Sequence, residues 1–219
     1  MEFLILKYLH IIAFVYWLGG DLGTFLASKQ VIRRDISAEA RHIALKIMLA
    51  CDQGPKVAMP LILPLGFHLS VLMGLIDAPT WLLVVVWLIC LDWCANVLVL
   101  YFNEGKPFTE SLAKIDFKFR IGVITALTLF AAHSLITDGL ISADWVAWKL
   151  LIFAAMVTSG LFIRVNLKPF IPAFGKMMQD GATEETDNAM HNSVTNCRPY
   201  VWFIWAGLFV NAAIGVHLI

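Results

Sequence analysis

Three histidines lie inside long apolar segments of the chain, where an imidazole either hydrogen-bonds a neighbour or holds a metal. They are His10, His68 and His133. A neutral imidazole costs less to embed in hydrocarbon than a charged side chain. An iron held by two imidazoles needs both ligands at a similar height in a helical bundle. The three histidines therefore favour one b-type haem, with His10 and either His68 or His133 as axial ligands.

Two other interpretations of these histidines stay open. Imidazole also suits copper, so transport of copper or another transition metal is an alternative. However, Cu(I) favours thioether and thiolate ligands, and Met73 stands alone near the outer end of its segment. In the third interpretation each histidine only hydrogen-bonds a neighbouring helix, and the chain is a non-catalytic subunit that anchors a membrane complex.

Charged residues inside the apolar segments are the candidates for proton transfer. Asp21, Asp92 and Arg120 are assigned this catalytic role, as a proton route to the cytoplasm. An ionisable group at such a depth costs about 2.5 to 3.5 kcal/mol on insertion scales, so it is expected to face the bundle and find a partner. We expect the two aspartates to pair with Arg120, Arg164 or Lys56, and such pairs can equally be structural.

Lys7 precedes His10 by three residues, so the two side chains project from a similar face of one helix. An ammonium at this position would meet a haem propionate or an anionic substrate. The alternative is that Lys7 only extends toward the membrane surface, as lysines near helix ends do.

The composition shows which elements position these residues. Hydrophobic residues make up 60% of the chain and charged residues 15%, with a mean hydropathy of +0.78, which excludes an ordinary soluble domain. A bilayer core about 30 Å thick needs roughly 20 apolar residues in a helix. Six segments approach that length: Phe3–Leu26, Val57–Ile76, Thr80–Phe102, Phe119–Ile136, Trp145–Ile163 and Tyr200–Ile219. The predicted fold is a single all-α domain over residues 1–219, a bundle of about six transmembrane helices in the lipid bilayer.

Basic residues are distributed unevenly, although the formal net charge is zero. Of the sixteen lysines and arginines, all except Lys7 and Lys149 lie in or beside the first, third and fifth connections. By the positive-inside rule these connections face the cytoplasm. Both termini are therefore expected on the periplasmic side of a bacterial cytoplasmic (inner) membrane, and nothing in the pattern supports nucleic-acid binding.

Two long polar stretches belong to the cytoplasmic side. An apolar stripe at helical spacing predicts an amphipathic helix near residues 37–52 on the membrane surface. Gly54-Pro55 then predicts a kink into the second span. The connection near residues 167–197 contains the acidic run QDGATEETDN and is interpreted as a loop.

The run LKYLHIIAFVYWLGG, which contains His10, resembles the first helix of the CopD/HemJ-like bacterial integral membrane proteins. The stretches GGDLGTFLAS, MPLILPLGFHLS, WKLLIFAAMVTSGLFIR and RPYVWFIWAGL resemble an uncharacterised branch of predicted multi-pass membrane proteins near that group. HemJ-like proteins are haem-associated and oxidise protoporphyrinogen, whereas CopD-like proteins are linked with copper uptake. The resemblance implies a role for the first-helix histidine, here His10.

Together these features predict a haem b protein of the inner membrane that works in electron transfer or oxidises a small lipophilic reductant. A quinol or a porphyrinogen fits that description. The expected partners are therefore a quinone or porphyrin, and a second copy of the chain or a larger membrane complex.

Overall fold

The computed structural model describes residues 1–137 and 139–219; Asp138 lies outside the described residues. The described residues form seven α-helices: α1 (Glu2–Val31), α2 (Ala38–Leu72), α3 (Thr80–Phe102), α4 (Pro107–Ile136), α5 (Asp144–Asn166), α6 (Phe170–Asp180) and α7 (Glu184–Gly215). Six helical stretches are long and apolar enough to cross a membrane, with α6 following α5 in the same stretch. The predicted all-helical fold with six helices that could span a membrane is confirmed.

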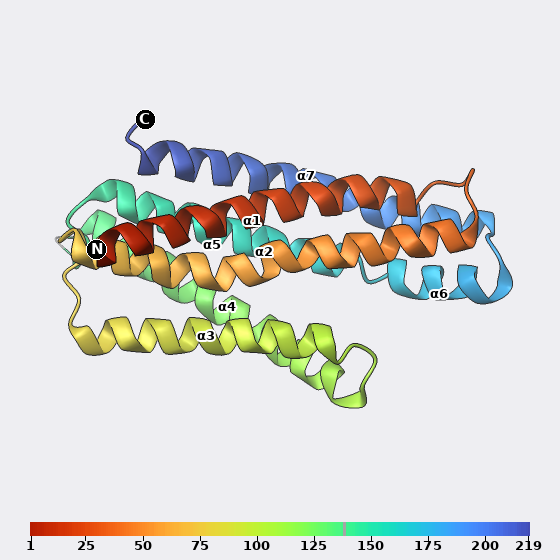
Figure 1. The fold of residues 1–219 in the computed structure, drawn as a ribbon, viewed down its shortest axis with the longest axis horizontal. Helices are drawn as coiled ribbons and strands as arrows, with labels where there is room; N and C mark the ends of the chain where they lie inside the picture. The colour runs from red at the N-terminus through yellow and green to blue at the C-terminus, as the bar shows by residue number, and fades with distance from the viewer. Residues whose placement is uncertain (138) are drawn as a thin grey trace.

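Both termini lie at one end of the bundle, which we call the terminal end (Figure 1). At 1.5 Å per residue, the 23 residues of α3 and of α5 each span about 35 Å. The helices α1, α2 and α7 have 30, 35 and 32 residues, and they run past the far end of α5 with α6 beside them (Figure 1). We call this projecting part the extended end. The longer helices therefore carry a helical projection beyond the membrane-spanning part.

Helix α2 is continuous through Gly54-Pro55, so the predicted surface helix and the second span form one element. A proline in a helix leaves the carbonyl four residues earlier without its donor, here that of Cys51. Helix α1 supports α2 at this point, because Gly20 lies so close that an added Cβ would be 2.8 Å from the Cys51 carbonyl oxygen. Of the predicted apolar stripe, Ala44 and Met48 face a protein core, whereas Ile43 and Ile47 are exposed.

The predicted loop near 167–197 is mostly helical, since it contains α6 and the first half of α7 with only residues 181–183 between them. Thr183 caps α7 in a capping box with Thr186, and acidic residues fill the first turn, where the helix dipole favours them. These helices close a core of the extended end with α1 and α2: Ala27, Val31, Ile32, Ala44, Met48, Phe170, Phe174, Met177, Met190 and Val194.

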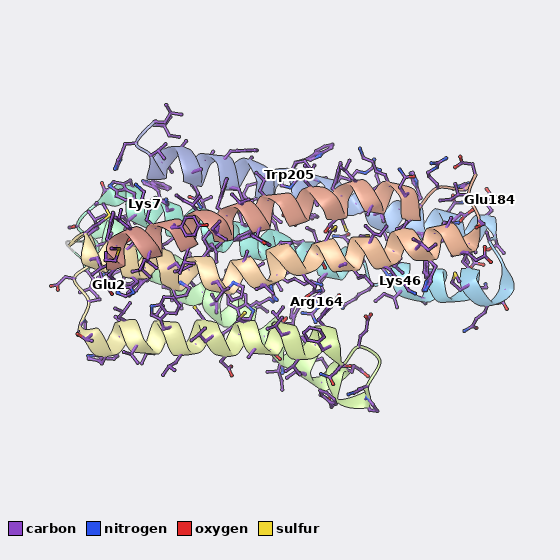
Figure 2. All side chains as sticks on the ribbon, in the orientation of Figure 1. Glu2, Lys7, Lys46, Arg164, Glu184 and Trp205 are labelled. Atoms are coloured by element: carbon purple, nitrogen blue, oxygen red, sulfur yellow. The ribbon has the colours of Figure 1, made fainter. Side chains whose placement is uncertain are left out.

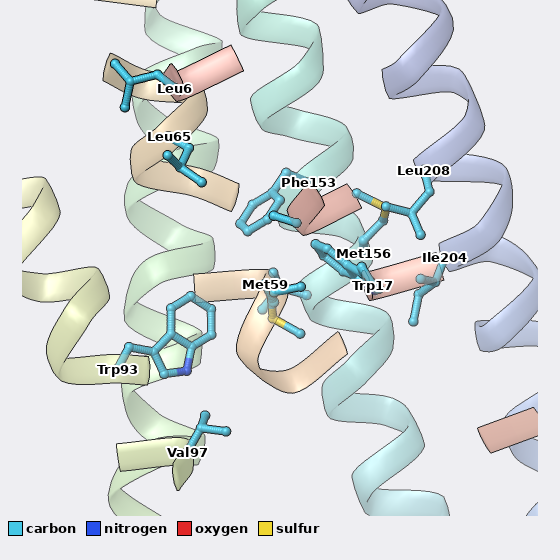
Figure 3. Close-up of a cluster of buried hydrophobic side chains, with 13 residues drawn as sticks. Leu6, Trp17, Met59, Leu65, Trp93, Val97, Phe153, Met156, Ile204 and Leu208 are labelled. Carbon is cyan, nitrogen blue, oxygen red and sulfur yellow. The ribbon is translucent and has the colours of Figure 1, made fainter. Parts of the chain in front are cut away.

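A second core lies between the helices of the bundle (Figure 3). Its central side chains come from α1, α2, α3, α5 and α7, and they include Trp17, Met59, Trp93, Met156 and Ile204. The Trp17 ring meets Phe153 edge to face, with centroids 5.9 Å apart. This core, which we call the central core, extends from Leu6 near the terminal end and includes Trp17, which lies between His10 and Asp21 along α1.

Candidate functional site

His10 lies inside the terminal half of the bundle, between α1 and α2. A Cβ added at Gly66 of α2 would be 2.9 Å from Cε1 of the imidazole, so this glycine makes room for the ring. The Nδ1 atom is buried and forms no hydrogen bond of normal geometry in residues 1–137 and 139–219, although the Ile62 backbone of α2 lies close to the ring. A buried polar atom in this state costs about 1 to 3 kcal/mol.

Lys149 and Asn211 complete a polar group with His10, which we call the terminal-end cluster. The Lys149 ammonium on α5 is close enough to act on the His10 ring through its charge. A second glycine makes room for it, because a Cβ at Gly215 of α7 would be 2.6 Å from Nζ. The Asn211 amide donates to the Lys149 carbonyl at 3.4 Å, and its own Oδ1 is buried with no partner in the described chain.

His68 belongs to a different side of α2. It lies two residues after Gly66, so the two positions are about 200° apart around the helix. The His68 Nε2 lies 3.4 Å from Oε1 of Glu2, and its ring meets Trp87 of α3 edge to face at 6.4 Å. His10 and His68 are thus similar in height but point in different directions.

His133 is exposed on α4, and its Nδ1 lies 3.3 Å from the Thr137 hydroxyl one turn further on. Lys7 is exposed as well and stands on the outer side of α1 (Figure 2). Of the four residues assigned to a cofactor, only His10 is placed in a polar interior site.

These positions do not fit a haem held by His10 with His68 or His133, because the rings do not face a common space. Among the described residues there is also no group of three His, Cys, Asp or Glu side chains that could hold a metal. Haem-dependent electron transfer and copper transport therefore stay predictions, and we derive no step through haem or copper.

Asp21 lies eleven residues after His10, which is three helical turns, so both side chains share one face of α1 about 16 Å apart. Its Oδ2 is buried and forms no hydrogen bond of normal geometry within the described part of the chain, although the Trp17 side chain lies close to the carboxylate. Asp52 of α2 is close enough to act on Asp21 through its charge. Lys56, one of the predicted partners of Asp21, instead pairs with Asp52.

The predicted pairing of Asp21 or Asp92 with Arg120 or Arg164 is wrong, because both arginines bind Asp116. The Arg120 Nε and the Arg164 Nη1 each lie 2.9 Å from Asp116 Oδ2. Figure 2 labels Arg164 near the middle of the molecule. The i, i+4 spacing of Asp116 and Arg120 signals this pair. It is missed because the predicted span starts at Phe119, whereas α4 begins at Pro107.

Asp92 lies on the outer surface of α3. Its neighbour Trp93 points inward and is buried, whereas Asp92 is exposed. No ion pair or hydrogen bond reaches Asp92 from the side chains that the structure describes. Asp92 and Arg120, assigned to one proton route with Asp21, are therefore not brought together.

Two hollows lie on the sides of the bundle, and neither includes a predicted site residue. A groove of about 610 Å³ lies between α4, α5 and α7, lined mainly by apolar and hydroxyl side chains. A second groove of about 410 Å³ follows the contact of α1 and α2 beside Gly19, Gly20 and Gly54. Polar groups that converge inside the bundle, and not a wide pocket, define the candidate site.

The comparisons with known proteins give no function for the polar groups of the candidate site. The resemblance to CopD/HemJ-like proteins stays a prediction, because no family model, no curated protein and no solved structure matches this chain.

Proposed function

We propose that this chain is a membrane protein that carries protons, with His10 and Asp21 as the groups that bind and release them. One observation carries the proposal: two titratable side chains share one face of α1, and each has a buried polar atom without a partner in the described residues. Intramembrane ionisable residues typically face the bundle interior and mark proton relays or ion pathways. Asp116 is paired with two arginines, whereas Asp21 forms no ion pair in the described residues, which sets these two carboxylates apart.

The two groups suit this task by their chemistry. A neutral imidazole has one donor and one acceptor nitrogen, so it can receive a proton on one side and release it on the other. A carboxylate accepts and returns a proton through its oxygens. Lys149 and Asn211 add polar atoms beside His10, which favours entry of water at the terminal end.

The central core prevents a continuous water path between the two groups. Trp17 lies between His10 and Asp21 on α1 and is 1% exposed, and its ring meets Phe153 of α5 edge to face. In the proposal, His10 exchanges protons with the terminal side and Asp21 with the extended side. Transfer between them requires the central core to open, so transport is gated by movement of the helices.

The distribution of basic residues indicates which end of the bundle faces the cytoplasm. The extended end and the neighbouring connections carry nearly all of the basic residues, which favours the cytoplasmic side. We therefore place Asp21 toward the cytoplasm and His10 toward the periplasm of a bacterial inner membrane.

The test uses the purified chain in liposomes with a potassium gradient, valinomycin and an internal pH-sensitive dye. Addition of valinomycin imposes a membrane potential, and we expect proton flux well above that of protein-free liposomes. Asp21→Asn and His10→Gln are each expected to reduce the flux at least tenfold, because each removes one exchangeable proton. Circular dichroism and size-exclusion profiles check that both variants fold.

Matched controls change the same residue types outside the proposed route. His133→Gln removes an exposed histidine, and Glu110→Gln removes an exposed carboxylate that pairs with Lys114. Both controls are expected to conduct as the wild type does. Wild-type flux no greater than that of empty liposomes, or unchanged flux in Asp21→Asn and His10→Gln, would show that the proposal is wrong.

A further inference from the structure

The outer surface of α3 carries one carboxylate at the middle of the membrane. Asp92 is the only charged residue in the 23 residues of α3, and it lies twelve residues from the start of the helix. That corresponds to about 18 Å along a helix about 35 Å long. The side chain is exposed and thus faces hydrocarbon in the isolated bundle.

Two opposite faces of α3 explain why Asp92 cannot turn inward. Cys90, Trp93, Cys94 and Val97 are the buried residues of this helix, and they pack toward the bundle. Asp92 belongs to the opposite stripe, which runs through the exposed residues Leu88, Asp92, Ala95 and Val99. Helical spacing places the centres of the two stripes about 180° apart. Rotating α3 to bury Asp92 would expose Trp93.

The internal cations cannot neutralise Asp92 either. Arg120 and Arg164 are both bound to Asp116 on the bundle side. An unpaired carboxylate at mid-membrane is costly, and such residues almost always pair or face a polar interior. No described cation of the chain forms an ion pair with Asp92, so a partner helix could supply one.

We propose that the stripe of Leu88, Asp92, Ala95 and Val99 binds a membrane-spanning helix of a partner protein that carries a lysine or arginine at mid-membrane height. The cation would pair with Asp92, because the surrounding hydrocarbon holds no water that could solvate the carboxylate. Ala95, one turn from Asp92, leaves room for the partner backbone to approach, as small residues do at membrane helix contacts.

A second copy of this chain does not provide such a cation. Of the exposed basic side chains on described spanning helices, Lys7 and His133 lie near the terminal end, and Lys29, Lys46, Lys114 and His191 lie beyond Lys118 toward the extended end. Lys118 lies about 9 Å further toward the extended end than Asp92, counted from the helix ends at 1.5 Å per residue. Two copies joined through the same stripe would also bring two carboxylates together.

The experiment measures binding of synthetic helices to the full chain in liposomes. The probe is a dansyl-labelled polyleucine helix with one central lysine, and energy transfer from the tryptophans of the chain reports binding. The comparison helices have leucine at the centre, or the lysine moved seven residues along. We expect the central-lysine helix to bind the wild type about tenfold more tightly than either comparison helix, and Asp92→Asn to abolish this difference.

Folding of the variant is not at risk, because Asp92 has no partner in the described part of the bundle, and circular dichroism checks this. Equal binding of the lysine and leucine helices to the wild type would overturn the proposal, as would an unchanged preference in Asp92→Asn. Self-association of the wild type that is lost in Asp92→Asn would also overturn it, since the occupant would then be a second copy. Each result is independent of the proton flux, because Asp92 is not on the proposed route.

Discussion

Two carboxylates lie at nearly the same height in the bundle and differ in what surrounds them. Asp116 lies twenty residues from the end of α4 and Asp21 nineteen residues from the start of α1, so each is about 29 to 30 Å from the terminal end. Asp116 binds two arginines and also accepts a hydrogen bond from Asn96 at 3.4 Å. Asp21 keeps a buried oxygen with no partner in the described chain.

The charge of Asp116 holds helices together, whereas the charge of Asp21 is free to change with its protonation. The Asp116 network links α3, α4 and α5, and removing its charge would leave two arginines without their counterion. Asp21 joins no such network, so its protonation state can change without breaking a contact between helices. Burial alone therefore does not identify a functional carboxylate here, whereas burial without a partner does.

The largest expected effect comes from Asp116→Asn. Breaking a buried ion pair by removing one partner typically costs about 3 to 5 kcal/mol, and here two arginines lose their counterion. Asp21→Asn should change the free energy of unfolding by less than about 1 kcal/mol, because no ion pair is lost. Unfolding in mixed detergent micelles, followed by tryptophan fluorescence, measures both. Equal losses in the two variants would remove the distinction between the carboxylates.

The ion pair of the extended end should show an intermediate effect. Arg41 Nη1 lies 2.7 Å from Asp187 Oδ1, and the two side chains are 2% and 11% exposed. Asp187→Leu alone is expected to cost about 2 to 4 kcal/mol, because the Arg41 charge stays buried. The double variant Arg41→Met with Asp187→Leu should recover most of this loss, because both charges are removed. A double variant less stable than either single one would show that the pair is a net stabilising contact.

The smallest effect is expected for Arg33 and Asp35, an exposed pair between α1 and α2. Hydrogen bonds from the Arg33 guanidinium lower the pKa of Asp35 from 3.8 to about 2. Because the pKa is lower in the folded chain, the pair stabilises the fold above about pH 4 and loses this effect as the pH falls toward 2. Titration of the Asp35 carboxyl by NMR checks this, and Arg33→Gln should raise its pKa to the ordinary range. A wild-type carboxyl that already titrates near pH 4 would contradict it.

The elements of the fold could be predicted closely where hydrophobicity decides them. The predicted span Thr80–Phe102 is α3 to the residue, because an apolar run lies between Pro79 and the polar residues after Phe102. The span Trp145–Ile163 falls within α5. Polar helices were harder to predict: the first turn of α7 contains Glu184, Glu185 and Asp187, which resemble a loop in composition although Thr183 caps a helix there.

The direction in which side chains point could not be predicted from the same signals. Heights along the membrane follow from residue counts, and His10 and His68 are indeed at similar heights. Their directions depend on which face of each helix meets a neighbour, and a helix that is apolar all round gives no periodic signal for that. The need for glycine at Gly66 and Gly215, which make room for His10 and Lys149, is visible only once α1, α2, α5 and α7 are packed together.

Helices α1 and α2 stay in contact along most of their length. The His10 ring packs on Gly66, and about 15 Å further along α1 Gly20 packs on Gly54. Beyond these glycines, Ala27 of α1 belongs to the same core as α2. Two helices joined by such a continuous seam bend less than either helix alone, so the extended end and the surroundings of His10 are expected to move as one unit.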